Sequence, residues 1–144
     1  MIFSFGQSKR ECIEIDVLGY ENQPVGEYYD DNWLTVEICV HAGGFHGKTC
    51  AALITSELVK SASELSLLFE TLSGSAKFET VEDQLSLQLV GDGKGHIELR
   101  GEVADRAGDG NRLSFTLQFD QSQLGISIRQ LEKVTLQFPV RVAL

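Results

Sequence analysis

Cysteine is rare in this chain, and the three present, Cys12, Cys39 and Cys50, cannot all pair within one molecule. An odd count fits no simple disulfide framework and is typical of reduced thiols, so we expect a cytoplasmic protein. No apolar run approaches the roughly 20 residues that span a bilayer. The first residues also lack the charged start of a signal peptide. We therefore expect neither export nor membrane insertion.

Basic residues are scarce as well. Lys and Arg together number 12 against 21 Asp and Glu, which leaves a formal net charge of −9. Contacts with phosphate need clustered Lys and Arg, so we expect no direct binding of nucleic acid and none of an anionic membrane. A negative surface would instead attract a basic partner, although acidity of this kind also serves solubility alone.

Motifs that indicate a catalytic or metal site are missing. The turn Gly91–Gly95 lacks the Gly-Lys-Ser/Thr ending of a phosphate-binding loop, and no Cys-x-x-Cys occurs. His41, His46 and Cys50 would lie on the polar side of one predicted hairpin, and a small hydrolase or metal-dependent enzyme that uses them is the alternative to a binding protein. Their spacing matches no zinc pattern, and nothing supplies an oxyanion hole. We expect no enzyme, no catalytic residue, no metal and no cofactor.

What the sequence does contain is alternation of apolar and polar residues, which is typical of antiparallel strands with one buried face. Short connections favour pairing of sequential strands as a meander. The pair Gly43-Gly44 predicts a tight hairpin in which His41 faces His46 and Glu37 faces Cys50. The expected strands are 2–5, 12–18, 33–42, 45–54, one that begins at Ala76, 84–89, 96–103 and 112–119.

Two segments have helical periodicity instead. The first runs from Thr55 to Gly74, with Thr55 or Ser56 as its N-cap and Gly74 as its left-handed end. The second runs from about Gln121 to Phe138, capped by Asp120 or Ser122 and stopped by Pro139. The residues expected to face the sheet are Leu58, Ala62, Leu65, Phe69 and Leu72 in the first, and Leu124, Ile128, Leu131 and Phe138 in the second.

These elements predict one α+β domain, residues 1–144, without an internal repeat or a linker. Its architecture is an antiparallel, meander-type β-sheet of about six to eight strands with two α-helices that cover one face.

Two polar connections carry the candidate binding residues. The first, 19–32, is long for a compact domain and rich in carboxylates, and the second is Asp105–Gly110. By parity, Trp33 lies opposite the core face of its strand, where a partly exposed Trp suits an interface as well as a packed sheet edge. The predicted partner contacts are Glu27, Asp30, Asp31, Trp33, Asp105 and Asp109.

Several short motifs occur in a set order along the chain, and most of their residues are Gly, Pro or aromatic. In this order and spacing the chain resembles, over nearly its whole length, the WapI family of bacterial immunity proteins. Gln123 and Gly125 depart from the family pattern, which has an aromatic residue and a helix former at these places. The motifs are Asp31-Asn32-Trp33-Leu34, Gly43-Gly44-Phe45-His46-Gly47, Leu72-Ser73-Gly74-Ser75-Ala76, Gly95-His96-Ile97, Gly101-Glu102, Asp120-Gln121-Ser122 and Phe138-Pro139-Val140.

This resemblance implies a small cytoplasmic protein that protects a cell by binding the toxic C-terminal domain of a contact-dependent or polymorphic toxin, often a nuclease. It implies occlusion of a basic toxin domain without catalysis, and it offers no catalytic residues to transfer. A generic dimerisation or ligand-binding domain that uses the outer face of the sheet is a further alternative. The oligomeric state does not follow from the sequence.

Overall fold

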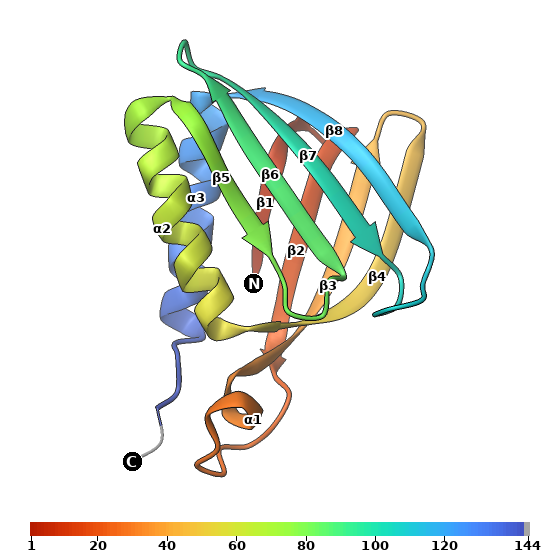
Figure 1. Ribbon diagram of the computed structural model, residues 1–144, viewed down its shortest axis with the longest axis vertical. Coiled ribbons are helices and arrows are strands. Elements are labelled where there is room, and N and C mark those ends of the chain that lie inside the picture. Colours follow the sequence, from red (N-terminus) through yellow and green to blue (C-terminus); the bar gives the residue numbers. More distant parts are fainter. Residues whose placement is uncertain (143–144) are drawn as a thin grey trace.

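The computed structural model describes residues 1–142, in which eight strands form two four-stranded antiparallel sheets (Figure 1). The first sheet contains, in order, β1 (Ile2–Ser8), β2 (Glu11–Tyr20), β3 (Trp33–Ala42) and β4 (Phe45–Ile54). The second contains β5 (Ser73–Glu79), β6 (Leu85–Asp92), β7 (His96–Ala104) and β8 (Arg112–Asp120). The helices are α1 (Tyr28–Asn32), α2 (Thr55–Thr71) and α3 (Gln121–Gln137).

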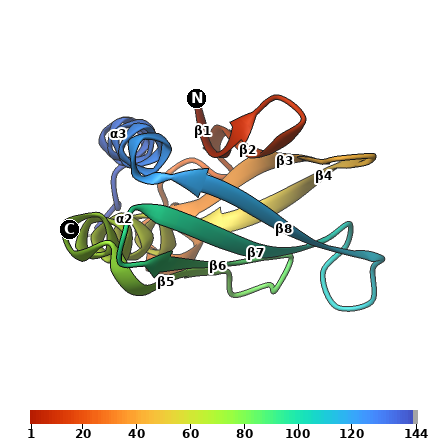
Figure 2. The ribbon, with the colours of Figure 1, turned by 90° about the horizontal axis from the view of Figure 1, so that it is seen from above.

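The predicted class, the antiparallel pairing of sequential strands and the number of strands are confirmed. The strands are divided between two layers, however, because α2 separates β4 from β5, so that the apolar face of each sheet is buried against the other. Figure 2 shows α2 and α3 side by side along one side of these layers, next to β5 and β1. The pattern of four strands and a helix therefore occurs twice, although the sequence shows no repeat.

Phenylalanines join the two sheets in the core. Phe3 of β1 lies 6.1 Å from Phe78 of β5, and Phe5 lies 6.5 Å from Phe119 of β8, measured between ring centroids. All four side chains are buried. The leucines, isoleucines and valines of the alternating pattern point inward with them, which is why each strand is apolar on one side only. The helices add Leu58, Leu65, Leu68, Leu124, Leu131 and Val134.

The hairpin of β3 and β4 has the predicted register. His41 pairs with His46 and Glu37 with Cys50 across the turn at Gly43-Gly44. Gly43 has a φ of 62°, a conformation that glycine adopts without strain.

The start and end of α2 differ from the prediction. Ile54 is the N-cap, and its N–H donates to the Glu57 carboxylate at 2.7 Å, while the buried Thr55 hydroxyl donates to Asn32. A hydroxyl cap at Thr55 or Ser56 was therefore the wrong prediction: both residues lie inside the helix, and Glu57 accepts from the N–H of the N-cap residue. The helix ends at Thr71, where Leu72 takes the left-handed conformation (φ 59°) that was expected of Gly74.

The apolar stripe of α2 is also shifted from the predicted one. Leu58 and Leu65 are buried as expected, but Leu68 is buried in place of Phe69, which is exposed beside α3. In α3, by contrast, the prediction holds: the Asp120 carboxylate accepts hydrogen bonds from two backbone N–H groups of the first turn. Leu124, Ile128 and Leu131 face the core, and Phe138 packs against it.

Side chains of α3 cover the outer edge of β1. The Ser4 N–H donates to the Gln130 side-chain oxygen at 2.9 Å, and the Ser127 hydroxyl donates to the Ser4 carbonyl. The helix thus occupies backbone groups that an open strand edge would offer to another chain. In the same way, α2 lies against β5, the first strand of the second sheet.

Candidate partner-binding surface

The connection between β2 and β3 protrudes from one end of the sheets (Figure 1). Its second half is not an irregular loop, as the sequence predicted, but the short helix α1, which leads directly into β3. Gly26, with a φ of 86°, turns the chain before this helix.

Asp31 holds this connection together from inside. Its carboxylate accepts hydrogen bonds from the N–H groups of Val25 at 2.7 Å and Gly26 at 2.9 Å, and the residue is only 4% exposed. The structure therefore places this predicted contact residue where it supports the connection, with its carboxylate turned away from solvent.

Asn32 ties the connection to the rest of the molecule. Its amide nitrogen donates to the carbonyls of Tyr28 and Arg141, and its oxygen accepts from the Thr55 hydroxyl and from the Arg141 N–H. The residue is completely buried. One side chain thus joins α1, the start of α2 and the C-terminal segment.

The C-terminal segment adds further links. The Tyr20 hydroxyl donates to the Pro139 carbonyl at 2.5 Å. The Arg141 guanidinium lies 3.4 Å from the centre of the Tyr20 ring and donates to the Asn22 carbonyl. A cation over an aromatic face and a hydrogen bond to the backbone together fix the near end of the connection.

The remaining side chains of the connection point outward. Tyr29 is 61% exposed and Val25 70%, and the rings of Tyr28 and Tyr29 meet edge to face with centroids 5.3 Å apart. Glu27 and Asp30 are exposed beside them. We call Val25, Glu27, Tyr28, Tyr29 and Asp30 the α1 prominence. Sequence reasoning selected the carboxylates and missed the tyrosines, although two adjacent aromatic residues in a polar connection are a readable signal.

Trp33 follows α1 as the first residue of β3. It is partly buried, opposite the core-facing Leu34, and pairs with Ile54 on β4, which agrees with the predicted parity. It lies at the base of the α1 prominence.

The second acidic connection, between β7 and β8, lies beside β4 and away from α1 (Figure 1). The Asp105 carboxylate accepts hydrogen bonds from the side chain and the backbone N–H of Asn111, and these bonds lower the pKa of Asp105. Asp109 forms an ion pair with Arg106 at 2.8 Å. The two acidic connections therefore do not form one surface.

His41 of the first sheet contacts both His46 and Cys39. The rings of His41 and His46 are stacked with centroids 5.9 Å apart, and the Cys39 sulfur lies 3.4 Å from His41 Nε2. Cys50 faces Glu37, whose carboxylate pairs with Lys48 instead. Among residues 1–142, no three His, Cys, Asp or Glu side chains are close enough to hold a metal ion.

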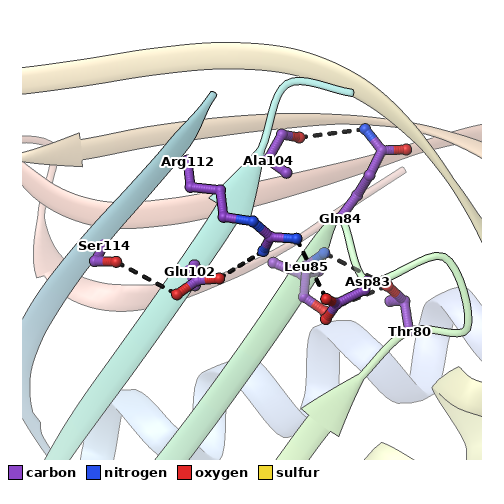
Figure 3. Close-up of polar contacts among 8 residues, drawn as sticks. All are labelled: Thr80, Asp83, Gln84, Leu85, Glu102, Ala104, Arg112 and Ser114. Atoms are coloured by element: carbon purple, nitrogen blue, oxygen red, sulfur yellow. Dashed lines mark hydrogen bonds and ion pairs between the residues drawn. The ribbon is translucent and has the colours of Figure 1, made fainter. Parts of the chain in front are cut away.

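Three charged side chains form an ion-pair group at the outer face of the second sheet (Figure 3). Arg112 lies between Glu102 at 2.5 Å and Asp83 at 3.3 Å, and these two carboxylates raise its pKa. The Gln84 side chain, just before β6, donates to the carbonyl of Ala104 at the end of β7. The face is polar, and the Arg and Glu side chains of β7 and β8 on it are paired with one another, so it resembles a solvated surface more than a contact surface.

No helix in the described part of the chain is long and apolar enough to cross a membrane. The model of the immunity protein WapI-like family matches residues 3–139. No curated protein sequence matches the chain. Among solved structures, that of MRP1/MRP2 from Trypanosoma bruciei is similar in fold, with a TM-score of 0.50 and 8% identity over 96% of this chain and 86% of that one. At this identity the likeness concerns the fold alone.

Proposed function

Because the chain belongs to the WapI-like family of immunity proteins, we propose that it neutralises a cognate protein toxin by binding the toxic domain and occluding it, without catalysis. The family match over residues 3–139 is the observation that carries this proposal. The binding would take place in the cytoplasm of the protected cell, where an incoming toxin domain has to be met before it acts.

The charge of the chain favours a basic toxin domain, such as one that acts on nucleic acid. A net charge of −9 draws a positively charged partner into encounter and speeds association. Occlusion then needs only a stable complex that fills or covers the surface that the toxin uses on its own substrate. It needs no chemistry from this chain.

Within this proposal the α1 prominence and Trp33 form the main contact, through the exposed carboxylates of Glu27 and Asp30. Asp31 supports them from inside the connection through its bonds to Val25 and Gly26. Asp105 and Asp109 form a second, separate acidic site. A toxin domain bound at the α1 prominence would contact this site only if it is large enough to extend to it.

Co-expression with the toxin domain encoded by the neighbouring gene tests the proposal. We expect the chain to rescue growth and to elute with the toxin in size-exclusion chromatography. The double variant Glu27→Gln/Asp30→Asn is expected to weaken the complex more than Glu70→Gln/Glu132→Gln, which removes two exposed charges from α2 and α3. Continued killing together with the absence of a complex at low salt would refute the proposed function.

A further inference from the structure

Large apolar side chains are exposed at the α1 prominence in a way that folding does not explain. Tyr29 contacts its neighbour Tyr28 edge to face, and Val25 is mostly open to solvent. Tyrosines bury a large area on binding at a low cost in side-chain entropy, and they are enriched among the residues that dominate binding energy. The prominence therefore has the composition of a contact centre.

The backbone beneath these side chains is fixed before any partner arrives. Asp31 binds two N–H groups of the connection, Asn32 holds the Tyr28 carbonyl, and Arg141 holds the Asn22 carbonyl. Asn22 in turn donates to the Asp30 carbonyl. Because its backbone is already ordered, the prominence loses little conformational entropy on binding, and more of the interaction energy remains as affinity.

The charges around the tyrosines have one sign. The segment from Gly19 to Asn32 contains no Lys or Arg, and Glu21, Glu27 and Asp30 are all exposed on it. Arg141, a cation packed against it, is turned onto the Tyr20 ring. A partner that fits this surface needs an apolar recess with basic groups around it.

We propose that the α1 prominence is the anchor of the toxin contact: Tyr28 and Tyr29 enter the substrate cleft of the cognate toxin domain, and Glu27 and Asp30 pair with Lys and Arg side chains on its rim. A cleft that binds an anionic substrate has these basic groups, and a protruding element fits a cleft better than a flat sheet does. This inference rests on the proposed function and specifies how the toxin is blocked.

Phe45 supplies a matched comparison within the same molecule. It lies at the tip of the β3–β4 hairpin, is 72% exposed, and carries no such group of carboxylates on its own segment, residues 43–48. If exposed aromatic area alone decided binding, Phe45 would matter as much as Tyr29. If the α1 prominence is the anchor, Phe45 would matter much less than Tyr29.

The test measures binding of the purified toxin domain, with its own activity inactivated, to the full chain by isothermal titration calorimetry. We expect Tyr29→Ala to weaken binding about tenfold or more and Tyr28→Ala/Tyr29→Ala about a hundredfold, as at other aromatic anchors. Tyr29→Phe keeps the ring and is expected to retain most of the affinity. Phe45→Ala is expected to stay within about twofold of the wild type. Thermal unfolding of each variant identifies any that fail to fold.

The binding kinetics distinguish the role of the two tyrosines from the role of the carboxylates Glu27 and Asp30. The tyrosine variants are expected to raise the dissociation rate at every salt concentration, whereas Glu27→Gln/Asp30→Asn lowers the association rate and its dependence on salt. If the folded tyrosine variants bind like the wild type, or Phe45→Ala alone loses binding, the inference is overturned while the proposed function stands. If the wild-type chain does not bind the toxin domain, both fall.

Discussion

Asn32 is a side chain on which the position of the α1 prominence depends. It is completely buried, and each of its polar atoms serves two partners: its nitrogen serves two carbonyls, and its oxygen serves the Thr55 hydroxyl and the Arg141 N–H. Polar groups in such a position are expensive to leave without a partner. The position of the α1 prominence and the stability of the fold therefore depend on the same residue.

Replacement of this side chain gives the first prediction. We expect Asn32→Ala to lower the free energy of unfolding by about 2–4 kcal/mol, because several buried groups lose their partners at once. Urea denaturation followed by the fluorescence of Trp33, the only tryptophan, measures this change. Asn22→Ala, at an exposed position with a single side-chain bond, is the control and should cost less than about 1 kcal/mol. Equal effects of the two variants would contradict the central role of Asn32.

Asp105 leads to a prediction about acid stability. Hydrogen bonds from the side chain and backbone of Asn111 lower its pKa in the folded state. Its contribution to stability is therefore complete above the ordinary aspartate pKa of about 3.9 and is lost as the pH falls through the lower folded-state value. We expect Asp105→Asn to flatten the decline of unfolding free energy below about pH 4, measured by urea titrations at successive pH values. An unchanged decline would show that other carboxylates account for it.

Single residues also mark the limit of what could be predicted from the sequence. Glu27 and Asp31 look equivalent in the chain, yet one is exposed and the other accepts two backbone hydrogen bonds inside the connection. Which carboxylate turns inward depends on where backbone N–H groups point after folding, and no local pattern records this. The exposure of Tyr28 and Tyr29 likewise depends on how the chain turns at Gly26 before α1.

At the level of the strands, the Phe115 ring of β8 packs closely over Gly101 of β7. Gly101 pairs with Phe115, and a methyl group built on Gly101 would lie 2.3 Å from an atom of the Phe115 ring. Such a contact is far too short, so the ring occupies the space that a side chain at position 101 would need. The absence of a side chain is what allows the buried aromatic residue at this place.

The second sheet should therefore tolerate a larger residue at position 101 only if Phe115 is replaced by a smaller side chain. We expect Gly101→Ala to destabilise the protein by about 1–3 kcal/mol through overpacking. In the double variant Gly101→Ala/Phe115→Leu, the total loss should fall short of the sum of the single losses by about 0.5 kcal/mol or more. A double-mutant cycle of chemical denaturation measures this coupling. Additive losses would mean that the ring does not respond to position 101.

Strands were easier to predict than their arrangement in layers. Alternation identifies the buried side of each strand, and the Gly43-Gly44 turn determines the pairing of His41 with His46. Neither observation indicates that β4 and β5 belong to different sheets. That separation follows from the direct entry of the chain from Ile54 into α2, where Ile54 rather than a Ser or Thr is the N-cap and its N–H donates to Glu57.

Taken as a whole, the molecule carries a charge that should govern how fast it finds a partner. Surface charges act over about 10 Å at moderate ionic strength, and added salt screens them. We expect the association rate with the toxin domain to fall about tenfold between roughly 20 and 300 mM salt, while the dissociation rate changes little. Stopped-flow fluorescence measures both rates. Association that is indifferent to salt would argue against a basic partner.

The cover over β1 has a consequence for how the protein is made. Gln130 and Ser127 supply that cover, and the Ser4–Gln130 pair spans 126 residues of sequence. A contact at such a distance cannot form until residue 130 has left the ribosome. The bonds of Arg141 to Asn32 and Asn22 form later still. During synthesis the edge of β1 is therefore open to other chains, and a nascent chain would be most prone to aggregate before α3 emerges.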